Sequence, residues 1–254
     1  MRPIKIIAEI GINHNGSLET AKKLIYEAKQ AGADLAKFQL RDHSSRIDLD
    51  THPWKDILLK CTLSRRMVQE LKLYCDMNDI EFFASPFDLD AVRLLEEIGV
   101  KRYKIASNQV YNEPLVRAIY NTAKPVMVSY GAVRDDFVKP PLIMKMFEKD
   151  GVEYPDIKKL YCISKYPAPI EDIDFFIHYS FGYRSIFEYY DGFSDHTIGI
   201  AAAMVAMSLG AKIIEKHFTL DRDMPGPDHS CSATPSDLKA LCSFRDEVER
   251  ILYK

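Results

Sequence analysis

The stretch Ile4-Lys5-Ile6-Ile7-Ala8-Glu9-Ile10-Gly11-Ile12-Asn13-His14-Asn15-Gly16-Ser17, residues 4–17, contains one complete strand-to-helix junction. The apolar run over residues 4–11 predicts a buried strand, and Ser17 is a good N-cap for a helix over residues 18–30. Seven further apolar runs also close on a polar or ionisable residue before a loop and a helical pattern. They cover residues 35–40, 80–87, 102–107, 125–131, 159–164, 192–196 and 212–219. Eight such units over 254 residues predict an α/β fold, a single-domain (β/α)₈ TIM barrel.

Helical patterns fill the gaps between these runs. They cover residues 18–30, 65–78, 90–98, 113–122, 137–149, 170–187, 200–209 and 235–252. Gly32, Gly99 and Gly210 end three of these helical patterns just before the next apolar run, which is typical of a helix that is followed directly by a strand. Residues 41–60 have weak periodicity and are predicted to form a long loop over the mouth of the barrel.

The composition argues against several classes of protein. The net charge is −3 and the chain has no tract of Lys or Arg, which disfavours a nucleic-acid binder. The five cysteines are odd in number and form no Cys-x-x-Cys pair, so we expect reduced thiols. A strand follows the first three residues, which leaves no room for a signal peptide, and no apolar run approaches the roughly 18 residues of a membrane span. We expect a soluble, cytoplasmic protein without nucleic-acid or membrane partners.

The strand ends of a parallel barrel share one mouth, so the residues that close the runs are expected to converge there. They are Glu9, Lys37, Gln39, Ser85, Lys104, Ser107, Ser129, Ser164, Ser194, His196 and His217. Because side chains alternate along a strand, Lys37 and Gln39 face the same way, and so do Glu215 and His217. A lysine inside a barrel is costly without a partner, so a carboxylate or an anionic ligand is expected beside it.

Two histidines suggest a metal site. His196 and His217 end neighbouring runs, and Glu9 on the next strand can add a carboxylate directly or through water. Two nitrogens and an oxygen suit Mn²⁺, Fe²⁺, Co²⁺ or Zn²⁺. The alternative is that both are core or loop histidines that hold backbone carbonyls.

The lysines and serines at the strand ends suggest an anionic, phosphorylated substrate, because ammonium and hydroxyl groups together bind phosphate and carboxylate. For any single serine, a solvated strand end is the competing interpretation. Asp228 follows the turn-rich Met224-Pro225-Gly226-Pro227, where its carboxylate suits sugar hydroxyls or an Asx-turn. Residues 13–16 form either a substrate-facing loop or a cap for the first helix.

Several strings along the chain resemble the sialic acid synthase family, whose members condense phosphoenolpyruvate with an N-acetylated hexosamine or a relative of it. The resemblance covers essentially the whole chain. The strings are Ile7-Ala8-Glu9-Ile10-Gly11-Ile12-Asn13-His14-Asn15-Gly16, Ala36-Lys37-Phe38-Gln39, Tyr166-Pro167-Ala168-Pro169, Ser194-Asp195-His196-Thr197-Ile198-Gly199, and Glu215-Lys216-His217-Phe218-Thr219-Leu220 with Gly226-Pro227-Asp228-His229.

The resemblance implies an enzyme, a transferase that makes a nonulosonic acid and releases phosphate. It also implies a divalent metal ion, Mn²⁺ with Mg²⁺ or Co²⁺ as alternatives, which polarises the sugar aldehyde, and a homodimer. Matched residue by residue, the catalytic group is Glu9, His196 and His217, with the metal on His196 and His217. The phosphoenolpyruvate group is Lys37, Ser85, Lys104, Ser107, Ser129, Ser164 and Ser194, and the sugar group is Gln39, Tyr166 and Asp228.

Some positions depart from the family pattern. Asn108 and Gln109 stand where Gly and Glu are usual, which puts a neutral amide in or near the acceptor pocket, and Tyr130 is expected to bring a ring into the mouth. The chain also stops after the eighth helix, without the usual C-terminal antifreeze-like domain. Two rivals stay open: a related phosphoenolpyruvate-dependent sugar-acid synthase with another acceptor, and a non-catalytic sugar- or phosphoenolpyruvate-binding partner of a full-length synthase.

Overall fold

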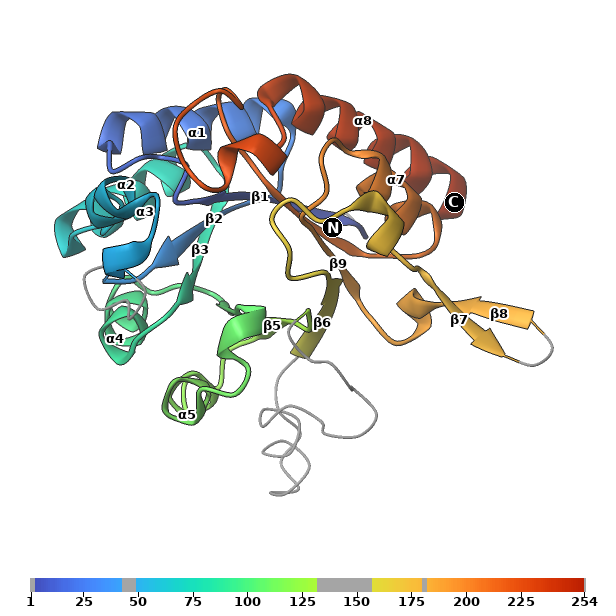
Figure 1. Cartoon of the computed structure of the whole chain (residues 1–254), viewed down its shortest axis with the longest axis horizontal. Coiled ribbons are helices and arrows are strands. Elements are labelled where there is room, and N and C mark those ends of the chain that lie inside the picture. The colour runs from blue at the N-terminus through green and yellow to red at the C-terminus, as the bar shows by residue number, and fades with distance from the viewer. Residues whose placement is uncertain (1–2, 43–48, 132–156, 180–181, 254) are drawn as a thin grey trace.

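A computed structural model describes residues 3–42, 49–131, 157–179 and 182–253. Eight parallel strands form one sheet in the order β3-β2-β1-β10-β9-β6-β5-β4, and β3 contacts β4, so the sheet curls into a barrel (Figure 1). The strands are β1 (Lys5–Gly11), β2 (Leu35–Leu40), β3 (Glu81–Pro86), β4 (Tyr103–Ile105), β5 (Val126–Ser129), β6 (Ile157–Cys162), β9 (Gly192–Asp195) and β10 (Ile213–His217). The predicted barrel is therefore confirmed, and only β6 begins outside its predicted run.

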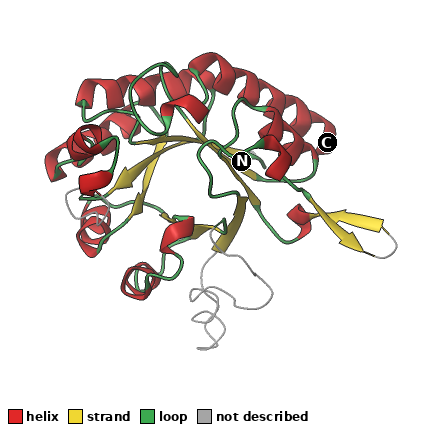
Figure 2. Ribbon diagram, in the orientation of Figure 1, coloured by secondary structure: helices red, strands yellow, loops and turns green. Residues whose placement is uncertain are grey.

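Helices cover the outside of this sheet (Figure 2). They are α1 (Leu18–Ala31), α3 (Arg65–Met77), α4 (Leu89–Glu97), α5 (Glu113–Tyr120), α7 (Ala201–Ser208) and α8 (Pro235–Leu252). The local signals act as predicted at both ends of α1: the Ser17 side chain accepts from the Thr20 amide, and Gly32 ends the helix in the left-handed conformation, φ 98°. The helix predicted over residues 137–149 lies outside the described residues.

The helix predicted over residues 170–187 is wrong. A 3₁₀ turn (Ile170–Asp172) is followed by the antiparallel pair β7 (Phe176–Tyr179) and β8 (Gly182–Ser185), which projects from the barrel in Figure 1. This stretch is rich in aromatic and β-branched residues, which favour strands over helices. Phe175, at its start, is buried edge-on against Phe193 of β9, with ring centroids 5.0 Å apart. That contact anchors the hairpin to the barrel.

The segment predicted as a loop over the mouth contains structure that its sequence pattern did not indicate. Its described part has a 3₁₀ turn (Leu49–Thr51) and the short helix α2 (Lys55–Lys60). Leu58 and Cys61 pack on Ile12, which ties α2 to the loop after β1. Its position at the mouth is confirmed, because Pro53 and Trp54 line the cavity described below.

Two apolar layers make the core. One lies between the sheet and the helices. The other fills the inside of the barrel with the side chains of Ile7, Leu35, Phe83, Met127, Leu160 and Ile213. All six are buried, so the barrel has a closed apolar floor.

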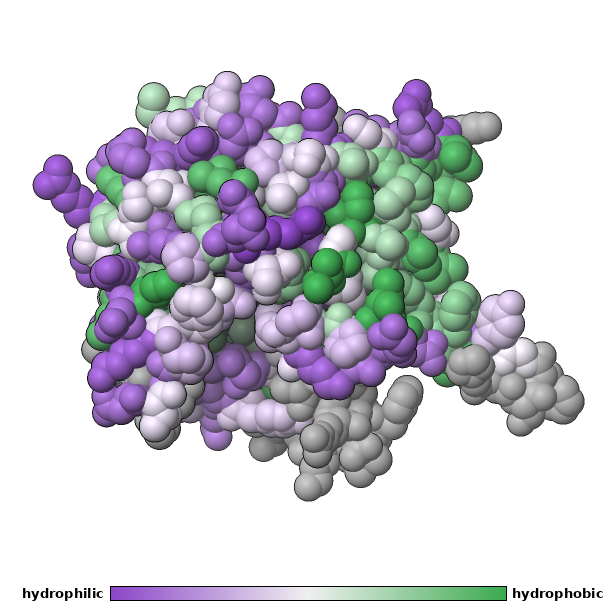
Figure 3. Space-filling view, turned by 45° about the horizontal axis from the view of Figure 1, so that its top comes forward, coloured by the Kyte–Doolittle hydropathy of each residue, from purple (hydrophilic) through white to green (hydrophobic). Residues whose placement is uncertain are grey.

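Within the described part of the chain, no helix has the length and apolar character needed to cross a membrane. The most uniformly apolar helix is α7, which has no charged residue. Its residue Val205 is 48% exposed, and Figure 3 shows apolar surface gathered on the side of the molecule that carries α7 and the end of α8.

Candidate active site

A polar layer lies directly on the apolar floor of the barrel. Because side chains on a strand alternate, the residue two positions after each floor residue points the same way, one layer nearer the mouth. Glu9 follows Ile7 in this sense, Lys37 follows Leu35, Ser85 follows Phe83, Ser129 follows Met127 and Glu215 follows Ile213. These side chains line one cavity of about 580 Å³ at the carboxyl ends of the strands.

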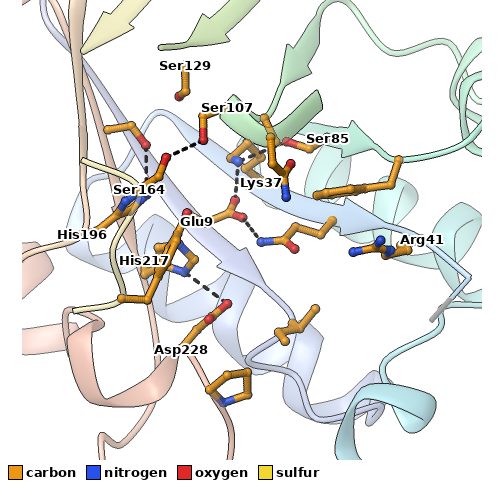
Figure 4. A pocket seen from close by; sticks show the side chains of 18 of the residues that line it. Glu9, Lys37, Arg41, Ser85, Ser107, Ser129, Ser164, His196, His217 and Asp228 are labelled. Carbon is orange, nitrogen blue, oxygen red and sulfur yellow. Dashed lines mark hydrogen bonds and ion pairs between the residues drawn. The ribbon is translucent and has the colours of Figure 1, made fainter. Parts of the chain in front are cut away.

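Every site residue predicted from the sequence lines this cavity. The thirteen are Glu9, Lys37, Gln39, Ser85, Lys104, Ser107, Ser129, Ser164, Tyr166, Ser194, His196, His217 and Asp228. Figure 4 shows many of them directed towards a common centre. The convergence expected at the barrel mouth is therefore present in the geometry.

Glu215 lies at the centre of this layer, although it is not one of the site residues predicted from the sequence. Its Oε1 accepts from Lys104 Nζ at 3.1 Å and from Ser194 Oγ at 2.8 Å, and its Oε2 lies 3.3 Å from Lys37 Nζ. Burial opposes its charge, but Lys104 and Lys37 outweigh burial and hold the pKa of Glu215 well below the ordinary value. The signal was available, since Glu215 shares a strand face with His217.

The second carboxylate, Glu9, is held between an ammonium and an amide. Its Oε2 lies 3.0 Å from Lys37 Nζ, and its Oε1 accepts from Gln39 Nε2 at 3.0 Å. Burial raises the pKa of Glu9 despite the opposing charge of Lys37. Glu9 is the easier of the two carboxylates to protonate, because burial is offset mainly by one lysine at Glu9, whereas two lysines and Ser194 hold the charge of Glu215.

The two buried lysines differ in their electrostatics. Burial lowers the pKa of Lys104, whose carboxylate partner is Glu215. Lys37 is as deeply buried, but Glu215 and Glu9 together overcome burial and raise its pKa. Two lysines and two glutamates balance in charge, which is how this layer meets the cost of burying ions.

The serines are arranged as hydroxyl donors around the lysines. Ser107 Oγ and Ser164 Oγ are 2.7 Å apart, and Ser85 Oγ accepts from Lys37 Nζ at 3.3 Å. The Oγ of Ser129 is buried and makes no hydrogen bond with the described residues. A buried hydroxyl in that state has donor capacity left for a ligand.

His196 and His217 meet at the opposite wall, with ring centroids 5.6 Å apart. His196 Nδ1 donates to the Ile163 carbonyl at 2.7 Å, which leaves the lone pair of Nε2 directed away from the backbone. Burial lowers the pKa of His196 to about 4 and puts that of His217 well below its ordinary value. Both imidazoles are therefore neutral at pH 7, the form that binds metals.

This histidine pair fits a divalent metal ion. The Nδ1 of His217 is buried, makes no hydrogen bond with the described residues, and lies 3.7 Å from Asp228 Oδ2. Among those residues no group of three or more His, Cys, Asp or Glu is arranged to hold a metal. Glu9 is engaged by Lys37 and Gln39 instead, so an ion on the two imidazoles would take its other ligands from substrate or water.

Two of the residues predicted to hold the sugar, Tyr166 and Asp228, lie beside the histidines. The Tyr166 ring is 4.1 Å from the His196 ring and edge-on to His217 at 5.7 Å. The Asp228 side chain makes no capping hydrogen bond to the 3₁₀ turn that follows it, which argues against the Asx-turn alternative. The mouth also carries Arg41, whose guanidinium lies 5.1 Å over the Phe87 ring, and Trp54, neither of which was predicted.

One expectation about the departures from the family pattern is wrong. Tyr130 does not enter the mouth: since its neighbour Ser129 faces inward, Tyr130 faces outward and packs edge-on against Tyr190, at 6.1 Å. Gln109 does not line the cavity, because its Oε1 accepts from Asn112 Nδ2 at 2.9 Å. Asn108 is the departure that does line it.

Comparisons with known proteins agree with this geometry. The model of the NeuB family matches residues 24–254. N,N'-diacetyllegionaminic acid synthase of Campylobacter jejuni is 35% identical, over 99% of this chain and 78% of that protein. N-acetylneuraminate-9-phosphate synthase of Homo sapiens is 33% identical, over 98% of this chain and 71% of that protein. The crystal structure of N-acetylneuraminic acid (sialic acid) synthetase from Leptospira borgpetersenii, in complex with citrate, is 30% identical with a TM-score of 0.84, over 99% of this chain and 86% of that one.

Proposed function

This chain is an enzyme of the NeuB family, and we propose that it condenses phosphoenolpyruvate with an aldose of the N-acetylmannosamine type. C3 of phosphoenolpyruvate forms a bond to the aldehyde carbon, water adds at C2, and the C2–O bond breaks to release phosphate. The products are a nonulosonic, sialic-type acid and inorganic phosphate. The observation that carries the proposal is the pairing of an anion-binding wall with two neutral histidines across one cavity.

Phosphoenolpyruvate binds against the lysine and serine wall. Lys37 and Lys104 supply positive charge, and Ser107, Ser129 and Ser164 supply directional hydroxyls. The anion competes with Glu215 and Glu9 for the two ammonium groups. Because the lysines are already buried and held, they orient the ligand with little further loss of side-chain entropy.

His196 and His217 would hold the divalent ion, for which Mn²⁺ is the first candidate. When bound, this ion supplies a Lewis acid that polarises the aldehyde oxygen of the sugar. The histidines themselves contribute neutral, fixed nitrogens: the Ile163 carbonyl sets the tautomer of His196, and burial keeps both rings uncharged.

The acceptor sugar lies between the histidines and the outer loops, held by Gln39, Tyr166 and Asp228. Glu9 is at the junction of the two substrates and has a raised pKa, which suits a group that exchanges protons with the added water or with a sugar oxygen. The two curated relatives described above are named for different products, so we propose the acceptor only to the level of an amino sugar.

The test is phosphate release from phosphoenolpyruvate with Mn²⁺, measured against N-acetylmannosamine, 2,4-diacetamido hexoses, mannose and arabinose 5-phosphate. His217→Ala is the loss variant. Ser185→Ala is the matched control, since its hydroxyl bonds the Leu209 carbonyl far from the cavity. Metal-dependent release with one sugar, kept in Ser185→Ala and lost in His217→Ala, supports the synthase and identifies its acceptor.

Release with none of these sugars, although phosphoenolpyruvate binds, would instead favour the non-catalytic binding partner. Release only with a sugar outside the amino sugars would favour the related synthase with another acceptor. The homodimer stays a prediction, which sedimentation of the purified protein checks.

A further inference from the structure

The loop after β1 is fastened to the loop after β10. Asn13 is 1% exposed and is not among the residues that line the cavity. Its Nδ2 donates both hydrogens, to the Phe218 carbonyl and to Ser232 Oγ, each at 2.9 Å. The alternative that this loop caps the first helix is wrong, because Ser17 caps α1, and none of residues 13–16 lines the cavity.

Ser232 connects Asn13 to Asp228 by a second hydrogen bond. Its Oγ is completely buried and donates to the Asp228 carbonyl at 2.6 Å. A hydroxyl has one hydrogen, so with Asn13 donating to its oxygen, that hydrogen is directed at Asp228. The result is a directional relay from Asn13 through Ser232 to the backbone of Asp228.

A second attachment holds the other side of the same turn. Asn15 Nδ2 donates to the Pro225 carbonyl at 3.0 Å, which leaves Asn15 Oδ1 facing His229 Nε2 at 3.3 Å. Between these contacts Gly226 has φ +155°, and a Cβ there would come within 2.7 Å of the His229 ring. The turn that precedes Asp228 is thus packed against Asn15 and His229 with no spare room.

We propose that Asn13, Asn15, Ser232 and His229 form an interloop clasp that positions the Asp228 carboxylate against His217 for the acceptor sugar. The inference rests on the proposed function only where it assigns Asp228 to the sugar. The carboxylate itself is 3.7 Å from His217 Nδ1. These four are positioning residues: none of them is part of the cavity wall, and each acts through the turn that carries Asp228.

The test compares Ser232→Ala with Ser185→Ala, which removes the same kind of hydroxyl, bonded to the Leu209 carbonyl at 2.9 Å, from a site remote from the cavity. Hydrogen exchange is followed in the amides of residues 219–233, and KM is measured separately for phosphoenolpyruvate and for the acceptor. We expect Ser232→Ala to exchange about tenfold faster in this segment and to raise the acceptor KM about tenfold. The phosphoenolpyruvate KM of Ser232→Ala should stay within twofold of wild type. Ser185→Ala should match wild type in the exchange rate of residues 219–233 and in both KM values.

Asn13→Ala provides the second variant, because it removes the start of the relay and leaves Ser232 in place. It should accelerate exchange in the same segment. Equal exchange in Ser232→Ala and Ser185→Ala would overturn the clasp, and so would a parallel rise of both KM values. If the wild type turns over no sugar, the proposed function fails, while the exchange comparison still decides whether the clasp exists.

Discussion

Replacing Glu215 by Gln removes the charge at the centre of the polar layer while keeping the size of the side chain. Two buried lysines then face a neutral group. Removing one partner of a buried ion pair costs about 3–5 kcal/mol. Lys37 keeps Glu9 at 3.0 Å and Ser194 still has an amide oxygen to bond, so we expect the lower end, about 3 kcal/mol.

The first assay is thermal unfolding without ligand. A loss of about 3 kcal/mol lowers Tm by roughly 6–12 °C in a chain of this size. The matched control is Glu113→Gln, which breaks a surface pair with Arg117 in which both side chains are 57% exposed. Such a pair contributes under about 1 kcal/mol, so the control should shift Tm very little.

The pH dependence of Glu215→Gln gives an independent check. Lys104 loses the carboxylate that opposes the effect of burial, so its lowered pKa falls further. The unfolded chain holds that proton up to about pH 10.5, so in this window it binds more protons than the folded variant. The stability of the variant therefore rises as pH increases from 7 towards 10, more steeply than that of wild type.

Binding of an anion should restore the thermal stability of Glu215→Gln. With Glu215 neutral, phosphoenolpyruvate no longer competes with that carboxylate for Lys37 and Lys104, so it binds more tightly and raises Tm more than in wild type. The reasoning is refuted if Glu215→Gln unfolds within the error of the Glu113→Gln control. It is also refuted if phosphoenolpyruvate stabilises the variant less than the wild type.

Three further changes test other parts of the architecture. Asp195→Asn breaks a fully buried pair with Lys216 at 3.0 Å, and we expect a loss of about 3–5 kcal/mol in urea unfolding; a midpoint like that of wild type would contradict it. Gly192→Ala puts a Cβ 2.1 Å from the Ile213 carbonyl between β9 and β10, so soluble expression should fall sharply, and normal yield and Tm would speak against it. Ser129→Ala removes a buried hydroxyl that has no hydrogen-bond partner in the described part of the chain, so no hydrogen bond is lost and Tm should change by under about 2 °C. The Kd of phosphoenolpyruvate, measured by calorimetry, should rise severalfold, and an unchanged Kd would contradict the role of this hydroxyl.

The barrel itself was predictable from the sequence, because its signals are local. Each apolar run, each cap such as Ser17 and each helix-ending glycine such as Gly32 acts within a few residues of its own position. Eleven of the predicted site residues converge for a related reason: they close the apolar runs, and closing parallel strands into a barrel brings the carboxyl ends together regardless of side chain. The other two, Tyr166 and Asp228, lie in loops and were predicted from the family resemblance. The prediction from local pattern failed at residues 170–187, whose sequence is compatible with both a helix and a pair of strands. There the packing of Phe175 on Phe193 favours the hairpin.

Tertiary structure alone decided which of these residues are partners. Strand alternation turns Glu215 inward, but only the closed barrel places it against Lys104, which is 111 positions away, and against Lys37. Asn13 reaches Ser232 over 219 positions for the same reason. The sequence by itself determined the eight barrel strands, the polar residues at their ends and the face of each strand that turns inward, but not the hairpin of β7 and β8. The contacts within the site depend on distances between strand ends that no local pattern contains, because they are set by the closure of the sheet.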